Sequence, residues 1–206
     1  MSAIRRLTKA LAVAGCILIS FASWCALPPS SDCILNDSRV KVTRAIVRAS
    51  TPYVLKGEKY GSVWVSLNSE MSFVPGESSK EKSKTIQIGE AGLVRPGTSV
   101  QFRAVGNPAG VLIVVEPKTT HQPLTITSLS LDTELEDASD SNETLLIAIS
   151  ACRLQDTRNT GDESEWIPSR PEIISLKAGH MRWLRAGTHH LENLGSDKSK
   201  LVEIEW

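Results

Sequence analysis

Four histidines and a group of carboxylates are the side chains of this sequence best suited to chemistry. His121 and His180 lie in turn-like segments, whereas His189 and His190 are adjacent in an alternating polar segment. Because successive side chains of a β-strand point to opposite faces, only one of the adjacent pair can enter the interior of a sheet structure. An imidazole that meets carboxylates can bind a metal ion or orient a polar ligand. The pair is therefore the first place to look for a site.

Carboxylates are concentrated between Asp132 and Glu143, a segment with six acidic residues and no basic one. Oxygen ligands suit Ca²⁺, but the Asp-x-Asp-x-Asp-Gly spacing of calcium loops is absent, which favours a solvated loop. The chain also lacks a Gly-rich phosphate loop, a Gly-x-Ser-x-Gly elbow and a His-Glu-x-x-His motif. Nucleotide-binding, serine-hydrolase and metalloprotease functions therefore lose their usual sequence support.

The elements that must position these groups are short strands. Alternating residues and short apolar runs are separated by turn residues, a pattern typical of an all-β sandwich or barrel. The run at 111–115 is uninterrupted, as expected of a buried strand. The expected strands are 39–48, 62–67, 85–88, 99–104 and 111–115, then 124–131, 144–149, 173–176 and 201–205.

The second set of strands repeats the first. A segment rich in turn residues, 117–123, separates the two sets. We therefore expect two β units that arose by duplication, spanning residues 27–117 and 118–206. Four residues of the first half recur in the second half at one constant offset: Gly89, Arg95, Gly97 and Thr98 match Gly179, Arg185, Gly187 and Thr188.

The end of the second unit resembles the second sequence motif of the cupin superfamily. That motif runs from a glycine through Pro-x-Gly to a histidine and an asparagine. Here Gly179, Gly187, the histidine pair and Asn193 fit it, with Arg185 in place of the proline. The resemblance covers most of residues 39–206 and implies a duplicated cupin-like double-stranded β-helix, a jelly-roll barrel in each unit.

The first cupin motif is only partly present. Glu143, followed by an apolar run to Ser150, is similar to its glutamate-to-glycine part, but its His-x-His is missing and Asp137 falls in one register of it. Cupins use these histidines and the glutamate to hold a divalent metal inside the barrel. The resemblance implies at most a set of Asp137, Glu143 and either His189 or His190, which would hold Mn²⁺, Fe²⁺ or Ca²⁺ loosely.

Two interpretations of function follow from the resemblance. The first is a non-catalytic module without a cofactor, which binds a small molecule or carbohydrate or has a structural role as a homodimer. The second is a metal-dependent cupin enzyme of dioxygenase or isomerase type that uses the carboxylate and histidine set. In the first interpretation the ligand contacts at the mouth of the second barrel are His189, His190, Glu192, Asn193, Glu143 and Trp183.

The N-terminal residues 1–26 read as a secretory signal peptide. Arg5, Arg6 and Lys9 precede an uncharged run at 10–27, and small residues favour cleavage after Ala22 or Cys25. A lipid anchor at a cysteine of this segment and an uncleaved membrane-anchoring helix remain the alternatives. All of them predict export to the periplasm or the cell exterior.

Charge and cysteine content limit the partners. The formal net charge is zero, which argues against nucleic acid and against an anionic membrane, except through an N-terminal anchor. In an oxidising compartment Cys33 and Cys152 could form a disulfide that joins the N-terminal segment to the body. Cleavage after Ala22 would leave Cys25 as a third candidate for pairing.

Overall fold

The computed structural model describes residues 30–76, 82–106, 109–120, 122–132, 134–140, 143–159 and 167–206, with the backbone alone described at 134–140. Every regular element within these ranges is a β-strand, so they contain no helix that is long and apolar enough to cross a membrane. The expected all-β class is confirmed. The expected signal segment, Cys25 and His121 lie outside the described residues.

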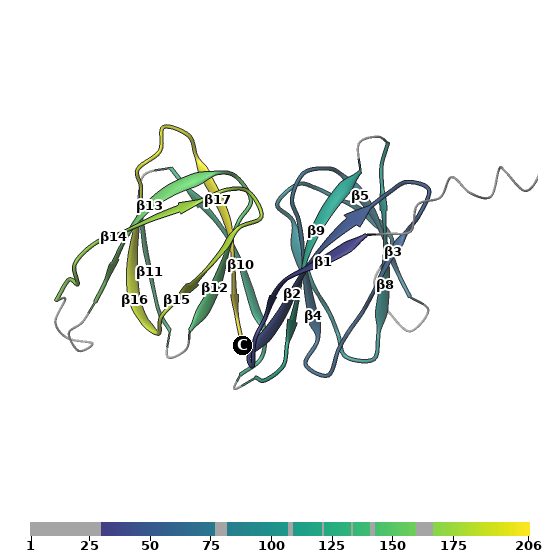
Figure 1. Ribbon diagram of the computed structural model, residues 1–206, viewed down its shortest axis with the longest axis horizontal. Coiled ribbons are helices and arrows are strands. Elements are labelled where there is room, and N and C mark those ends of the chain that lie inside the picture. The colour runs from purple at the N-terminus through teal and green to yellow at the C-terminus, as the bar shows by residue number, and fades with distance from the viewer. Residues whose placement is uncertain are drawn as a thin grey trace, which may run out of the picture.

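Within the residues that the structure describes, the first unit has nine strands, which form two antiparallel sheets (Figure 1). Their bounds are β1 Ser31–Asn36, β2 Val40–Val47, β3 Tyr53–Lys56, β4 Ser62–Ser66, β5 Met71–Pro75, β6 Lys84–Ile86, β7 Ala91–Val94, β8 Ser99–Ala104 and β9 Gly110–Pro117. The first sheet has the order β1-β2-β9-β4-β7, and the second has the order β3-β8-β5-β6.

The described part of the second unit contains eight strands, also in two antiparallel sheets. Their bounds are β10 Thr125–Leu131, β11 Glu134–Asp140, β12 Thr144–Ala148, β13 Cys152–Arg158, β14 Glu172–Leu176, β15 Met181–Leu184, β16 Gly187–Asn193 and β17 Ser199–Glu205. The sheet orders are β10-β17-β12-β15 and β11-β16-β13-β14.

The two units have the same topology. If β2 is matched with β10, β3 with β11, and so on to β9 with β17, each sheet of one unit has the strand order of its counterpart in the other. Only β1, an added edge strand, has no counterpart. Eight strands in two sheets of this order form a jelly roll. The duplication expected from the sequence is therefore confirmed.

Three apolar cores hold the molecule together. One lies inside the first unit around Trp64, Phe73 and Phe102, and another lies inside the second unit around Leu146 and Leu191. The third lies between the units, where the sheet containing β4 packs on the sheet containing β12. The two units therefore share a core in addition to having their own.

Strands β4 and β12 are buried along both faces because each separates two of these cores. Along β4, Val63 and Val65 face the core between the units, whereas Trp64 faces the interior of the first unit. Along β12, Ile147 faces the other unit and Leu146 faces inward. A strand with two buried faces needs a continuous apolar run in place of alternation.

The repeated glycines occupy turns that require a positive φ. Gly89 has a φ of 83° and Gly179 has a φ of 78°, a region that residues with a Cβ rarely adopt. The two turns also approach the opposite unit. A Cβ on Gly179 would lie 2.8 Å from Cδ1 of Leu67, and a Cβ on Gly89 would lie 3.3 Å from Cγ2 of Ile149. The Gly179 turn thus packs against the residue that follows β4, and the Gly89 turn packs against the residue that follows β12.

The two described cysteines are separate thiols. Cys33 is exposed on the edge strand β1 of the first unit, whereas Cys152 is buried in the core of the second unit. Burial raises the pKa of the Cys152 thiol, which disfavours the reactive thiolate. The structure thus does not contain the disulfide considered from the sequence.

Candidate functional site

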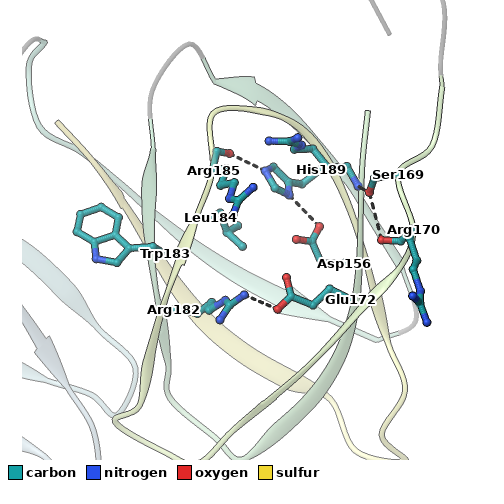
Figure 2. A pocket seen from close by; sticks show the side chains of 10 residues that line it. Asp156, Ser169, Arg170, Glu172, Arg182, Trp183, Leu184, Arg185 and His189 are labelled. Atoms are coloured by element: carbon teal, nitrogen blue, oxygen red, sulfur yellow. Dashed lines mark hydrogen bonds and ion pairs between the residues drawn. The ribbon is translucent and has the colours of Figure 1, made fainter. Parts of the chain in front are cut away.

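A cavity of about 340 Å³ opens in the second unit between β13, β14, β15 and β16 (Figure 2). Most of the residues around it are charged. The cavity has both acidic and basic side chains on its walls, and this mixture distinguishes it from the apolar core beside it. The ionisable residues that line it are Asp156, Arg158, Arg170, Glu172, Arg182, Arg185 and His189.

Two neighbouring strands supply the deepest polar groups. In β13, Leu154 and Asp156 are buried and the residues between and beside them are more exposed, as a strand with one inner face requires. In β16, His189 is buried and His190 is not. Arg158 lies directly opposite His189 in the β13–β16 register. Directly paired residues share a face of the sheet, so Arg158 belongs to the inner face as well.

Both ring nitrogens of His189 meet oxygen acceptors. Nδ1 lies 2.8 Å from Oδ1 of Asp156, and Nε2 lies 2.7 Å from the carbonyl oxygen of Arg185. A carbonyl oxygen can only accept, so Nε2 carries a proton, and an ionised Asp156 requires a proton on Nδ1 too. The contacts thus favour the imidazolium form of His189, paired with a buried carboxylate.

The charge state of His189 follows from opposing effects. Burial alone would lower the pKa of His189, but the hydrogen bonds to Asp156 and to the Arg185 carbonyl, with the charge of Asp156, outweigh it. The pKa of His189 therefore lies above its ordinary value of 6.5, although the positive charge of Arg158 opposes the rise. A ring with both nitrogens engaged in this way offers no lone pair to a metal ion.

His190 and Glu192 project from the other face of β16. Both are only partly buried, in alternation with His189, Leu191 and Asn193. Glu192 Oε2 accepts a hydrogen bond of 3.0 Å from Nε2 of Gln155. The structure therefore places one histidine of the pair, His189, in the cavity, and the ambiguity left by the sequence is resolved in its favour.

Asn193 has a structural role in the second unit. Its Nδ2 donates to the carbonyl oxygens of Leu131 and Asp197 at 3.2 and 2.8 Å. Its Oδ1 accepts from the Gly195 amide and the Ser199 hydroxyl, both at 3.0 Å. These contacts tie the turn after β16 to β10 and β17 and leave the side chain little capacity for a ligand.

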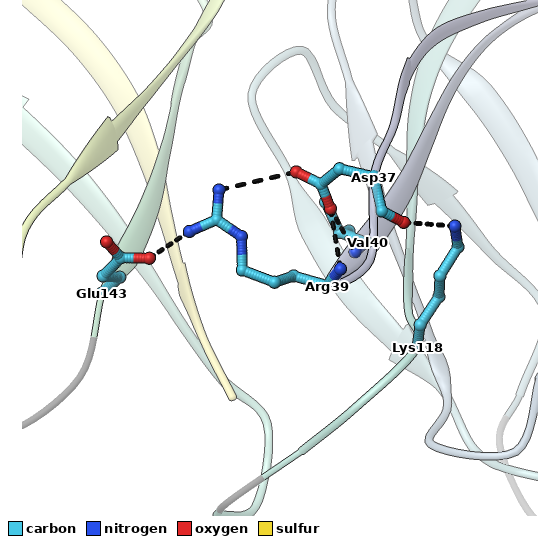
Figure 3. A network of polar contacts seen from close by, with 5 residues as sticks. All are labelled: Asp37, Arg39, Val40, Lys118 and Glu143. Atoms are coloured by element: carbon cyan, nitrogen blue, oxygen red, sulfur yellow. Dashed lines mark hydrogen bonds and ion pairs between the residues drawn. The ribbon is translucent and has the colours of Figure 1, made fainter.

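Glu143 and Trp183 lie at the junction of the two units and not beside His189. Glu143 forms an ion pair with Arg39, which extends from the first unit across the junction (Figure 3). The Arg39 guanidinium also stacks 4.1 Å from the centre of the Trp183 ring, and this ring contacts Trp206 at 5.3 Å between centroids. Trp183 borders the cavity, but its ring points away from it in Figure 2.

Asp137 lies opposite His189 in the register of β11 and β16. Its side chain is outside what the structure describes. Glu143 is engaged at the unit junction, so the expected carboxylate and histidine set does not assemble around His189. Across the described side chains, no three of the types that ligate metals come together at one point.

The carboxylate that does meet the histidine, Asp156, was missed by sequence reasoning. No strand is expected between residues 149 and 173, whereas β13 spans Cys152–Arg158. The alternation of Cys152, Leu154, Asp156 and Arg158 on one face was the available signal. The arginines around the cavity were missed as well, because they are scattered along the sequence and gather only on folding.

The matching strands of the first unit have apolar inner faces. Strands β5 and β8, the counterparts of β13 and β16, direct Phe73, Val100 and Phe102 into the core of the first unit. Phe73 packs against Phe102 and Trp64 at centroid distances of 5.7 and 5.8 Å. Aromatic rings thus fill the first unit, and the buried His–Asp pair is specific to the second.

No protein-family model and no curated protein sequence matches the chain. Solved structures do. A Cupin 2 conserved barrel domain protein from Leptotrichia buccalis superposes with a TM-score of 0.51 and 14% identity, covering 86% of this chain and 88% of that one. A conserved protein of unknown function from Pseudomonas aeruginosa PAO1 gives a TM-score of 0.61 and 12% identity, over 86% and 87% of the two chains.

An enzyme is among the similar structures. The Lactobacillus farciminis oxalate decarboxylase, in its formate complex, gives a TM-score of 0.59 and 8% identity, covering 85% of this chain and 80% of that one. Identities this low establish a common fold and leave function to the residues of the site. The similar regions cover 85% or 86% of this chain, so both units take part in the likeness.

Proposed function

We propose, on the premise that this chain has the cupin fold, that it is an exported, non-catalytic binding protein whose second unit holds a small molecule. The ligand occupies the cavity beside His189 and Asp156. A concave site of a few hundred Å³ with several placed polar groups is the usual form of a small-molecule site. The first unit, filled by its aromatic cluster, is the scaffold in this proposal.

The observation that carries the proposal is the state of His189. A metal ligand needs a neutral imidazole with a free lone pair, and a general base needs a free nitrogen within reach of a substrate proton. His189 has neither, because both nitrogens are hydrogen bonded within the protein and its pKa is raised. Its geometry suits a fixed positive charge in the wall of a binding site.

The alternative of a metal-dependent enzyme lacks support from the geometry. It requires Asp137, Glu143 and a histidine around one ion, but Glu143 is held by Arg39 and His190 faces away from the cavity. The described side chains therefore do not fit a cupin metal, and we derive no step through one. Of the six ligand contacts expected from the sequence, His189 and Trp183 border the cavity, and the Trp183 ring points away from it.

Two measurements test this proposal. The first is metal content by mass spectrometry of protein purified without a histidine tag, beside a His189→Ala/His190→Ala double variant. We expect substoichiometric metal in both proteins. A stoichiometric transition metal that is lost in the double variant would overturn the non-catalytic assignment and redirect the work to oxygen-dependent reactions.

The second measurement is thermal unfolding across a panel of sugars, sugar acids and small organic acids. A ligand that binds only the folded state stabilises it by about 2.7 kcal/mol at 100 times its Kd, which is readily seen as a shift in Tm. We expect at least one compound class to raise Tm in a saturable manner. A panel without any such compound would contradict a small-molecule function.

Export is part of the proposal and rests on residues 1–26. Their basic start, apolar run and small-residue exit are the features of a secretory signal. Expression of the full chain in a bacterial host, followed by mass determination of the protein in each cell fraction, tests this. We expect a product in the exported fraction that has lost about 22–26 residues. Uncleaved protein in the cytoplasm would contradict it.

A further inference from the structure

The cavity contains two internally compensated charge pairs. His189 pairs with Asp156, and their side chains are only 9% and 10% exposed. Arg182 pairs with Glu172 nearer the surface, where both side chains are solvated. With these pairs formed, each acidic group described in the cavity wall already has a basic partner.

Among the residues that the structure describes, three arginines of the cavity have no acidic partner. No ion pair joins Arg158, Arg170 or Arg185 to a described carboxylate. The chain as a whole has a formal net charge of zero. The excess of basic over acidic groups among the described lining residues therefore does not reflect a generally basic protein.

Two of these arginines are positioned by the fold. Arg158 lies opposite His189 in the β13–β16 register, and a Cβ placed on Gly187 would lie 3.6 Å from its Cδ. The aliphatic stem of Arg158 therefore runs beside the turn that starts β16. The backbone of Arg185 is held through its carbonyl oxygen, which accepts a hydrogen bond of 2.7 Å from Nε2 of His189. Figure 2 shows Arg185 beside His189, whereas the side chain of Arg170 points away.

We propose that the small molecule held in this cavity carries a carboxylate, and that Arg158 and Arg185 bind it. This inference rests on the binding function proposed above. A guanidinium group presents a planar set of donors that matches the two oxygens of a carboxylate. The His189–Asp156 pair beside them is internally compensated, and the hydrogen bond from His189 Nε2 to the Arg185 carbonyl oxygen fixes the backbone at Arg185.

The surroundings strengthen this recognition. Leu184 and the core behind it exclude water from one side of the cavity. Charge-assisted hydrogen bonds are stronger where the local dielectric constant is low. A neutral ligand of the same shape would leave two guanidinium groups unpaired, so the site discriminates by charge as well as by shape.

Matched acidic and neutral probes test the inference. Calorimetric titration would compare galacturonate with galactose, which share a ring and differ by one carboxylate, and citrate with its neutral triamide. Inorganic phosphate serves as the third anion. We expect at least one carboxylate to bind about 10- to 100-fold more tightly than its neutral counterpart, the range set by charge-assisted hydrogen bonds. Tighter binding of phosphate than of every carboxylate would overturn the choice of a carboxylate.

Variants show whether the two arginines are responsible. Arg158→Gln and Arg185→Gln should each weaken binding of the carboxylate about 10-fold or more and leave binding of the neutral probe unchanged. Arg153→Gln is the matched control, because Arg153 is an exposed residue of the same strand on the outer face. It removes the same charge and should leave affinity within about twofold, as expected of a solvated charge.

The outcomes separate this inference from the function on which it rests. Equal affinity for galactose and galacturonate, and for citrate and its triamide, would overturn the carboxylate assignment and leave the binding function standing. Equal losses in Arg153→Gln and Arg158→Gln would overturn the role of the cavity arginines. Absence of binding by all probes, together with a panel that shifts Tm nowhere, would overturn both proposals.

Discussion

At the scale of single residues, the informative contrast lies between the inner faces of matching strands in the two units. The inner faces of β5 and β8 carry Phe73 and Val100, whereas those of their counterparts β13 and β16 carry Asp156 and His189. Burial of a charged pair costs desolvation free energy that an apolar pair does not, and replacing such pairs by apolar residues is often neutral or stabilising. Asp156 and His189 are therefore poorly explained by stability alone, and a functional role explains them better.

The His189–Asp156 pair makes stability depend on pH. Folding raises the pKa of His189 above 6.5, so the folded state binds this proton more tightly than the unfolded chain does. The resulting stabilisation is complete below about pH 6.5 and is lost as the pH rises through the higher folded pKa. We expect the urea midpoint of the wild-type protein to fall across this window.

Asp156→Asn removes the carboxylate that raises the pKa of His189. The stability difference between this variant and the wild type should therefore shrink as the pH rises through the same window. Asp132→Asn is a suitable control, because Asp132 forms only an exposed ion pair with Lys198. Parallel pH profiles for wild type and Asp156→Asn would contradict the assigned linkage.

At the scale of elements, the sequence predicted strands better than it predicted their ends. The apolar run at 111–115 is confirmed as part of the buried strand β9. The acidic segment expected to be a solvated loop instead contributes β11, whose backbone pairs with β16. Whether such an acidic segment forms a strand depends on its partner strand in the sheet, and local composition does not identify that partner.

Local sequence also does not identify the distant partner strands that form the site. Period-two alternation sends His189 and His190 to opposite faces, as the structure shows, but it does not say which face is inner. That choice depends on the register with β13, which lies about thirty residues away in the sequence. The ion pair of Arg39 with Glu143 is equally non-local, because it forms only when the two units pack together.

The mirrored glycine turns give a prediction for this scale. Gly179 and Gly97 both have positive φ, but a Cβ on Gly97 would meet nothing within 4 Å, whereas one on Gly179 would meet Leu67 at 2.8 Å. Gly97→Ala should cost only backbone strain, about 1–2 kcal/mol. Gly179→Ala should cost about 1–3 kcal/mol more, from overpacking against the other unit. Urea unfolding measures both, and equal losses would contradict the contact.

At the scale of the whole molecule, the shared core makes the two units one cooperative structure. Val63 and Val65 of the first unit and Leu145 and Ile147 of the second lie in the same buried cluster. The ion pair of Arg39 with Glu143 adds little to this, since both side chains are more than 40% exposed. The two units are therefore coupled by apolar contact between their sheets and not by the surface ion pair.

We expect Leu145→Ala to lower the stability of both units together. The substitution removes buried atoms from the shared cluster and should cost about 2–5 kcal/mol. Scanning calorimetry should show a single transition that moves to lower temperature. Ile173→Ala, at a half-exposed position of β14, is the control and should change Tm little. A variant in which only half of the unfolding enthalpy shifts would show independent units.

The burial of β4 and β12 on both faces also sets the order in which backbone amides exchange with solvent. Strand β4 is hydrogen bonded to β9, and β12 is hydrogen bonded to β17. Backbone amides in these four strands open only when both units lose their packing. Most of the cavity wall belongs to the sheet β11-β16-β13-β14, in which the described side chains of β13 and β16 bury a single face and the edge strand β14 is half exposed. Backbone amides in the strands around the cavity therefore exchange with solvent before those in the centre of the molecule. A bound ligand would first slow exchange in the strands around the cavity.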